Sequence, residues 1–343
     1  MRNTNRQWRL KRFPDGLPSE DDWALVEGAI PEPGEAEFLV RAIYLSVDPY
    51  MRGRISPQQN YAAGVGLGDV MQGGAVGEIV RSNHPDFAVG ELVENIGFGW
   101  QDFAVLGAPG TTKVDPALGP ISAYLSYLGM PGLTAYFGIT EVGQVKPGDT
   151  VVISAASGAV GQVAGQVALA LGGHPIAVAG TDEKLAWCRE LGYEAGINHA
   201  TTPDLVAALA ETCPNGIDVY FDNTAGPIHD AVMQNLALNA RIIICGLISQ
   251  AATFGQPDIG ARYLRNLLVA RARMQGMLVF DWADRYETAR AQLAAWAKAG
   301  TLRHREDVLV GIEHMPEAFL RLLTGRNFGK QLVQVAEPPA GAT

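Results

Sequence analysis

The sequence is poor in cysteine. Its 343 residues include three, Cys188, Cys213 and Cys245, which are far apart and lack C-x-x-C spacing. An odd, scattered set does not predict a disulfide framework, and it favours a reducing, cytoplasmic location. A structural zinc site needs about four closely arranged ligands, and neither the cysteines nor the six histidines form such a cluster. We therefore expect no metal.

Positive charge and long apolar runs are also scarce. The chain has 26 lysines and arginines against 36 aspartates and glutamates, a formal charge of −10. Because a nucleic-acid binder needs a basic surface, this balance argues against nucleic acid as a partner. No apolar run approaches the roughly 18 residues that span a bilayer, so we expect no membrane association. The basic start, MRNTNRQWRLKRF, is not followed by the apolar stretch of a secretory signal.

The N-terminal third is rich in short apolar runs separated by glycine and proline. Runs of this kind cover residues 37–47, 73–80, 91–96 and 102–106. Their length and their turn-forming borders predict strands. A compact, mainly β domain is expected from residues 1–125.

Beyond that point, apolar strand-like runs alternate regularly with helical segments. The predicted strands have the sequences TVVISAA, HPIAVAG, EAGINH, GIDVYFDNT and ARIIICGL. Nearly continuous apolar strands that alternate with helices indicate a parallel sheet covered on both faces. The fold class predicted is therefore α/β, with a Rossmann-type doubly wound sheet beside the mainly β domain. The chain length suits two domains.

The first of these strands leads into a helix through a turn of small residues. Ala155, Gly158 and Gly161 give the spacing A-x-x-G-x-x-G within VVISAASGAVGQVAGQ. Glycine lets the backbone approach a pyrophosphate, and the amide groups at the helix start attract anions. The pattern alone also fits a helix that simply packs tightly on its strand. Within a β–α–β–α–β series, it favours a dinucleotide site.

The end of the next strand bears on the choice of cofactor. NAD enzymes usually place an acidic residue there to bind the ribose hydroxyls. Here the strand ends at Gly180, and Thr181 and Lys184 follow, which can donate to a 2′-phosphate. Asp182 could be the ribose acid, but it better suits the N-cap of the following helix. These residues favour NADP over NAD.

A set of longer motifs resembles a known family. In chain order, these motifs are YLSVDPYMRGR, SAASGAVGQVAGQ, AGTDEK, DVYFDNTAG, IIICGLIS, MQGMLV and NFGKQLV. Together they resemble the zinc-independent medium-chain dehydrogenase/reductase superfamily. The resemblance is strongest to the branch of prostaglandin and leukotriene reductases, plant alkenal double-bond reductases and bacterial curcumin reductase.

The resemblance implies a fold, an activity and a partner. Residues 1–125, completed by 311–343, would form a GroES-like substrate and catalytic domain, and 126–310 a Rossmann domain. NADPH would be the hydride donor, and the small-molecule substrate would be an α,β-unsaturated ketone or aldehyde. Homodimers are usual in the family. The segment MQGGAVGEIV lacks the His-Glu pair of zinc-dependent relatives, in agreement with the absence of a metal cluster.

The resemblance also assigns residues to the cofactor. The glycine turn would line the pyrophosphate, and the residues after the next two strands would lie near the 2′-phosphate. His199 stands where relatives often have tyrosine, and it could gain charge beside that phosphate. The implied cofactor residues are Met130, Thr134, Gly158, Ala159, Val160, Gly161, Thr181, Lys184, His199, Asn223, Cys245, Gly246, Leu278, Val279, Phe280 and Asn327.

Catalysis without zinc requires a donor for the negative charge that hydride addition leaves on the carbonyl oxygen. Tyr50 is the first candidate and Tyr61 the second; packing or exposure without function is the alternative for each. Relatives often carry a further tyrosine after the IIICG strand, where this sequence has Ala251 and Ala252. We expect a wider, less polar wall there. Tyr263 could approach the gap, but its spacing from Leu264 and Leu267 favours packing.

Two other functions fit the same residues. A quinone or alcohol oxidoreductase on this fold would keep the same cofactor residues, and so would a non-catalytic NADP-binding protein. Rates with an enone, a quinone and an alcohol would separate the enone reductase from the quinone or alcohol oxidoreductase. Cofactor binding without turnover across many enones would indicate the non-catalytic protein.

Overall fold

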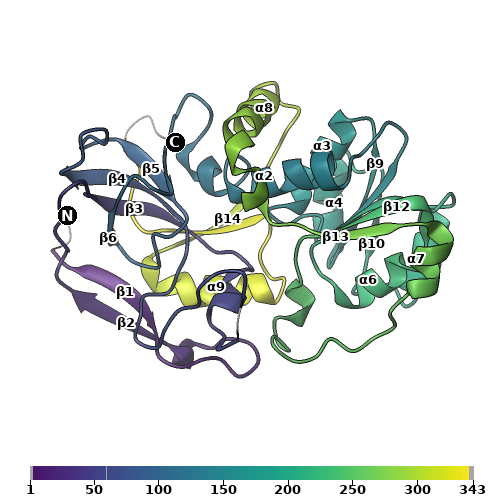
Figure 1. Ribbon diagram of the computed structural model, residues 1–343, viewed down its shortest axis with the longest axis horizontal. Helices are drawn as coiled ribbons and strands as arrows, with labels where there is room; N and C mark the ends of the chain where they lie inside the picture. The colour runs from purple at the N-terminus through teal and green to yellow at the C-terminus, as the bar shows by residue number, and fades with distance from the viewer. Residues whose placement is uncertain (1–2, 59, 340–343) are drawn as a thin grey trace. The chain divides into compact units, whose positions relative to one another are not determined.

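The computed structural model describes residues 3–58 and 60–339 (Figure 1). Contacts divide this part of the chain into two units. The first takes in the chain as far as Leu125, then Ala251–Gly255, then the chain from Glu306 onward. The second comprises Ser126–Gln250 and Gln256–Arg305.

The first unit is mainly β. A seven-stranded sheet has the order β14-β15-β3-β4-β5-β7, with β6 paired to β3, and β1 and β2 form a separate antiparallel pair. The strands are β1 (Asn5–Leu10), β2 (Trp23–Gly28), β3 (Phe38–Ser46), β4 (Ala75–Ser82), β5 (Leu92–Asn95), β6 (Phe103–Leu106), β7 (Thr111–Lys113), β14 (Glu306–Val310) and β15 (Lys330–Gln334). The helical segments are η1 (Glu20–Asp22), α1 (Met51–Arg54), η2 (Ile121–Leu125), η6 (Ile312–His314) and α9 (Met315–Leu323).

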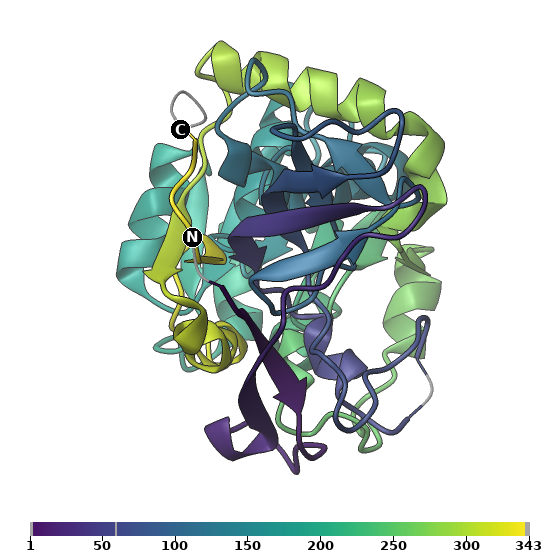
Figure 2. The ribbon, with the colours of Figure 1, turned by 90° about the vertical axis from the view of Figure 1, so that its left-hand side faces the viewer.

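Each of the four strands expected in the N-terminal third is present, as β3 to β6. The C-terminal segment completes the sheet, because β15 pairs antiparallel with the central strand β3. In Figure 2 the yellow C-terminal strands lie beside the purple N-terminal ones. β14 pairs parallel with β15 and so belongs to this unit. The second unit therefore ends at Arg305, five residues before the expected boundary at 310.

The second unit is built on a six-stranded, all-parallel sheet with the order β10-β9-β8-β11-β12-β13. Its strands are β8 (Thr150–Ser154), β9 (His174–Ala179), β10 (Ala195–Asn198), β11 (Ile217–Asp222), β12 (Leu236–Ile244) and β13 (Arg273–Gly276). Its helical segments are α2 (Met130–Phe137), η3 (Gly138–Val142), α3 (Gly161–Ala170), α4 (Asp182–Glu190), α5 (Leu205–Thr212), α6 (Gly226–Val232), η4 (Ile248–Gln250), α7 (Leu264–Ala270), η5 (Val279–Arg285) and α8 (Tyr286–Lys298).

Helices cover both faces of this sheet (Figure 1). The strand order reverses at β8, so right-handed crossovers put α3 and α4 on one face and α5 and α6 on the other. On the second face one apolar core joins the sheet to α5 and α6, and Leu267 of α7 packs against it. Tyr263 also packs on this core, as its spacing predicted. The α/β fold class predicted from the sequence is confirmed.

The three cysteines are shielded from solvent to different degrees. Cys188 and Cys213 are buried, Cys245 is partly buried, and none is in a disulfide. Burial raises the pKa of the Cys188 and Cys245 thiols to about 12. Among the described residues, no helix is long and apolar enough to cross a bilayer. The cytoplasmic location stays a prediction.

Candidate dinucleotide site and tyrosine cluster

The carboxyl ends of all six parallel strands lead into residues that the sequence assigned to the cofactor. In a parallel sheet these ends meet along one edge, and ligands of doubly wound folds bind there, near the point where the strand order reverses. That point is between β8 and β11. In sheet order, the residues that follow the strands are His199, Thr181 with Lys184, the turn 158–161, Asn223, Cys245 with Gly246, and 278–280.

The turn after β8 requires small residues. Ala155 has a positive φ of 48°, and its carbonyl accepts the N–H of Gly158 at 2.9 Å. A Cβ on Gly161 would lie 2.4 Å from that same carbonyl oxygen. Only glycine therefore lets α3 begin so close to the strand, and the start of α3, with the positive end of its dipole, then lies at the carboxyl edge.

A tyrosine that the sequence analysis missed fixes the start of α3. Tyr193 is 2% exposed, and its hydroxyl donates to the carbonyl of Gly161 at 2.6 Å. Its ring occupies the space beside Gly165, where a Cβ would lie 2.2 Å from the ring. The second glycine of the run GQVAG is therefore a packing residue. The signal in the sequence was this glycine within a helix, four residues after Gly161.

The turn after β9 corrects one expectation. Thr181, not Asp182, is the N-cap of α4, and its Oγ1 accepts the N–H of Lys184 at 3.2 Å. Asp182 is the first residue of the helix, and its Oδ1 accepts from the Asn198 amide at 2.8 Å. Thr181 has the extended backbone that an N-cap needs (φ −145°, ψ 154°). The Thr181 hydroxyl proton stays available to an anion.

His199 lies at the end of the neighbouring strand. Its N–H donates to the carbonyl of Ala179 at 3.1 Å. Its Nε2 would be 3.3 Å from a Cβ on Gly180, so the ring lies over the end of β9. Desolvation and then the positive charge of Lys184 lower the pKa of His199. His199 and Lys184 are thus close enough to act on the same group.

A buried carboxylate organises the turn after β11. Asp222 is fully buried, and its Oδ1 accepts the N–H groups of Thr224 at 2.9 Å and Ala225 at 2.8 Å. Its Oδ2 lies 2.8 Å from Nδ1 of His229, and this hydrogen bond raises the pKa of His229. The side-chain amide of Asn223 donates to the carbonyl of Ser154 at the end of β8, at 2.8 Å. Asn223 therefore ties the two central strands together.

The other predicted cofactor residues of the second unit differ in their hydrogen bonds and in their exposure to solvent. The N–H groups of Cys245 and Gly246 both donate to the carbonyl of Asp222, at 2.9 and 3.0 Å. The Thr134 hydroxyl donates to the carbonyl of Met130, one turn earlier in α2. Beyond β13, the segment 278–280 has a buried residue, Val279, between two exposed ones, Leu278 and Phe280.

Three predicted residues belong to the first unit. Tyr50 directly precedes α1, and Tyr61 is an exposed loop residue. Burial, followed by the charge of Asp48, raises the pKa of Tyr50. Asn327 is buried, and its amide donates to the carbonyl of Gly329 at 2.9 Å.

A buried ion pair sets the turn that carries Tyr50. Lys330 Nζ lies 2.6 Å from Oδ1 of Asp48, with side-chain exposures of 1% and 5%. The ammonium also donates to the carbonyl of Val47 at 2.8 Å, and the Ser46 hydroxyl donates to Asp48. The motifs VDPYMRGR and NFGKQLV therefore meet in space. Each motif is visible in the sequence, but their contact is not.

The segment with alanines in place of the family tyrosine packs within the first unit. Arg52 Nε donates to the carbonyl of Ala251 at 3.0 Å, and Nη2 donates to that of Gly16 at 2.9 Å. The Arg52 guanidinium carbon also lies 5.1 Å from the centre of the Phe254 ring. Arg52 thus holds this segment through the carbonyl of Ala251 and the ring of Phe254, and also bonds to Gly16.

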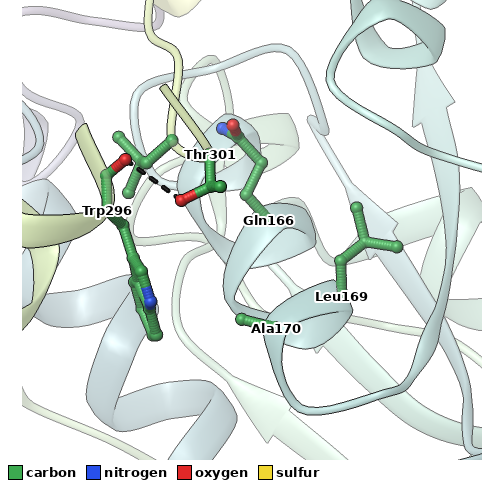
Figure 3. Close-up of a pocket in the computed structure, with 6 residues that line it drawn as sticks. Gln166, Leu169, Ala170, Trp296 and Thr301 are labelled. Atoms are coloured by element: carbon green, nitrogen blue, oxygen red, sulfur yellow. Dashed lines mark hydrogen bonds between the residues drawn. The ribbon is translucent and has the colours of Figure 1, made fainter. Parts of the chain in front are cut away.

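A pocket of about 240 Å³ lies elsewhere in the second unit. Figure 3 shows residues from the end of α3 and from the end of α8 around it. Because α3 begins at the carboxyl edge, its far end is at the opposite edge of the sheet. Gln166, a polar lining residue, already bonds to the carbonyl and the N–H of Arg303. This pocket is therefore separate from the candidate dinucleotide site.

The parallel sheet, its reversal point and the glycine turn define an α/β protein of the dinucleotide-binding class. Residues 6–114 match the family described as the N-terminal domain of oxidoreductase, and residues 159–295 match the zinc-binding dehydrogenase family. Despite the second description, the described residues contain no group of three or more His, Cys, Asp or Glu that could hold a metal.

Known relatives extend over nearly the whole chain. The NADPH-dependent curcumin reductase of Escherichia coli is 38% identical, covering 98% of this chain and 98% of its own. The 2-alkenal reductase (NADP(+)-dependent) of Nicotiana tabacum is 38% identical over 97% of this chain and 98% of its own. The crystal structure of CurA from Vibrio vulnificus in complex with NADPH is 42% identical, with a TM-score of 0.91, covering 97% and 100%. The chain belongs to the zinc-independent medium-chain dehydrogenase/reductase superfamily of oxidoreductases, as its motifs predicted.

Proposed function

We propose that this protein reduces the carbon–carbon double bond of α,β-unsaturated ketones or aldehydes, with NADPH as its reductant and without a metal. The main support is the carboxyl edge of the parallel sheet, where a turn that only glycine can form is followed by a helix start and by Lys184 and His199. The relatives named for NADPH and for conjugated carbonyl substrates add to this.

The residues of the edge fit a phosphorylated dinucleotide. The start of α3 offers the positive end of its helix dipole to the pyrophosphate, and Gly158 and Gly161 would let the phosphates approach the backbone. Thr181 and Lys184 donate to the 2′-phosphate, and His199 closes that end. A phosphate dianion stabilises the charged imidazole, so it counteracts the lowering of the His199 pKa by Lys184.

NADPH, when bound, supplies a hydride to the β-carbon of the substrate. The protein then has to stabilise the negative charge on the carbonyl oxygen and deliver a proton to the α-carbon. A tyrosine keeps its proton at neutral pH, and burial raises the pKa of Tyr50 further, so Tyr50 is available as the first hydrogen-bond donor to the oxygen. Tyr61, on its exposed loop, is the second donor.

Turnover with a substrate panel tests this function. We expect NADPH oxidation with enones and enals to exceed that with quinones or alcohols. At least one of the variants Tyr50→Phe and Tyr61→Phe should reduce the enone about tenfold more slowly than the wild type, which is equivalent to roughly 1.4 kcal/mol of barrier. Faster turnover of a quinone or alcohol would replace the proposal by an oxidoreductase of that class. Binding without turnover of any enone would indicate a non-catalytic NADP-binding protein.

We also propose that the protein is a homodimer. β13 is the edge strand of the parallel sheet, and all four of its residues are exposed. The adjacent helix α7 exposes Leu264, Leu268 and Val269. An open strand edge beside apolar side chains is typical of a surface that pairs with another chain. Sedimentation equilibrium should give about twice the mass of the 36.5 kDa chain, and a monomer at micromolar concentration would refute the dimer.

A further inference from the structure

Arg54 contacts the rings of both tyrosines proposed as donors. It ends α1 and is 6% exposed. Its guanidinium carbon is 5.4 Å from the centre of the Tyr50 ring and 4.9 Å from the centre of the Tyr61 ring. Both distances are within the range of a cation–π contact. One charge therefore faces both phenol rings.

The charge of Arg54 is not matched by a carboxylate. Within residues 3–58 and 60–339, no Asp or Glu oxygen lies within 4 Å of its guanidinium nitrogens, and its buried Nε has no hydrogen-bond partner. Its Nη1 reaches the carbonyl of Ala63 only at 3.5 Å. Arg52, two residues earlier, is by contrast bonded to two carbonyl groups at 3.0 Å or less. Burying an unmatched charge costs free energy, and such arrangements are concentrated at functional sites.

The backbone of Arg54 also anchors the loop that carries Tyr61. The N–H of Val65 donates to the Arg54 carbonyl at 2.7 Å. A Cβ on Gly64 would lie 3.2 Å from the same oxygen, so the returning chain passes close to α1. Arg54 thus contacts both the ring of Tyr61 and the point where its loop returns to α1.

A cation against a phenol ring favours the phenolate and strengthens the hydroxyl as a donor. The other charged or titratable groups facing Tyr50 are Asp48, Glu94 and Tyr61. Burial and these three groups raise the pKa of Tyr50, and Arg54 acts against them. Lys330 is already paired with Asp48. Arg54 is thus the cation that the described contacts assign to this cluster.

We propose that Arg54 is a positioning residue for the reaction, which orients Tyr50 and Tyr61 and makes their hydroxyls stronger donors to the carbonyl oxygen and α-carbon of the substrate. This inference rests on the proposed enone reduction. As hydride adds to the β-carbon, the C=C π electrons move to form an enolate. A tyrosine O–H bond then breaks, its proton forms a C–H bond at the α-carbon, and the phenolate left behind takes a proton from water.

Two variants and one control test the role of Arg54. Arg54→Met removes the charge and keeps much of the volume, whereas Arg54→Lys keeps the charge. Arg41→Met removes an arginine of the same unit that pairs with Glu78 on the sheet, and serves as control. Titration of the Tyr61 hydroxyl is followed by NMR of ring-labelled tyrosine, with Tyr61→Phe for assignment. kcat and KM are measured as functions of pH.

We expect Arg54→Met to move the Tyr61 titration to higher pH by about one unit. kcat for an enone should fall about tenfold, its alkaline limb should move in the same direction, and KM for NADPH should not change. Arg54→Lys should recover a large part of both effects, and the control should show neither.

An unchanged Tyr61 titration in folded Arg54→Met would overturn the proposal. If that variant does not fold, as judged by circular dichroism, Arg54→Lys decides: near-wild-type titration and kcat support a role of charge, and a full loss of kcat with unchanged titration refutes it. The titration does not depend on turnover. If the wild type reduces no enone, the proposed function fails, and the NMR shift still tests the contact.

Discussion

The two units present their candidate residues in different ways. In the second unit, the residues assigned to the dinucleotide follow the ends of successive strands of one parallel sheet, so their neighbours in space follow from the order of elements. In the first unit, the tyrosine cluster depends on contacts between distant segments, such as Lys330 with Asp48 and Ala251 with Arg52. Local sequence patterns therefore predict the order of residues along the sheet of the second unit, but only part of the tyrosine cluster of the first unit.

The largest expected effect is at the glycine turn of the second unit. Gly161→Val puts side-chain atoms where a Cβ already lies 2.4 Å from the Ala155 carbonyl. The start of α3 has to move, so NADPH affinity should fall at least about a hundredfold and the free energy of unfolding by about 2 kcal/mol. Calorimetry and urea denaturation measure the two effects.

Gly260→Ala is the matched control, because nothing lies within 4 Å of its added Cβ. It should leave both quantities unchanged. Wild-type NADPH affinity in Gly161→Val would show that the turn does not form part of a cofactor site.

The first unit should be most sensitive at its long-range ion pair. Lys330→Met leaves Asp48 buried without its partner and should lower the free energy of unfolding by about 3–5 kcal/mol. Lys113→Met removes an exposed pair with Glu91 in the same unit and should cost less than about 1 kcal/mol. Urea denaturation of the two variants measures the difference. Equal losses of unfolding free energy would mean that the buried Lys330–Asp48 pair stabilises the fold no more than an exposed ion pair does.

A smaller effect is expected at the proposed 2′-phosphate site. Lys184→Ala removes one charged donor, so the affinity for NADPH should fall about tenfold or more, which corresponds to roughly 1.5–3 kcal/mol. The affinity for NADH should not change, because NADH has no 2′-phosphate. Lys146→Ala, on an exposed loop of the same unit, is the control. An equal loss of affinity for both cofactors would place Lys184 outside this contact.

The smallest effect concerns pH. Because the pKa of His229 is raised in the folded protein, protonation there adds stability below its ordinary pKa of about 6.5, and this is lost as the pH rises through the folded value. His229→Gln keeps a donor for Asp222 but no charge. Its free energy of unfolding should fall short of the wild type by about 1 kcal/mol or less at pH 5.5, and by less at pH 8.5.

His174→Gln removes an exposed histidine paired with Glu194 and provides the reference. A His229→Gln deficit that grows with rising pH would contradict the direction of the His229 shift.

The sequence predicted much of the second unit because its signals are local. Each predicted strand ends at a polar or glycine-containing turn followed by a helix, and these elements are present. The N-cap of α4 was wrongly given to Asp182, since two adjacent residues can both cap a helix and only the backbone conformation selects Thr181. Tyr193 and Gly161 are separated by 32 residues in the sequence. The sequence hinted at their contact only through Gly165, a glycine inside a helix.

The first unit was predicted less completely. β14 was not recognised, because its half-exposed residues become a strand only through pairing with β15. Arg54 was quoted within a family motif but was given no role. Its significance depends on its contact with two tyrosine rings and on having no carboxylate oxygen within 4 Å in the described part of the chain, and neither property can be read from spacing along the chain.

Calorimetric titration of the wild-type protein with NADPH and with NADH tests the central claim most directly. A dinucleotide on the carboxyl edge of the parallel sheet, with its 2′-phosphate beside Lys184, Thr181 and His199, predicts at least about tenfold tighter binding of NADPH. Equal or tighter binding of NADH, or no binding of either cofactor, would contradict it.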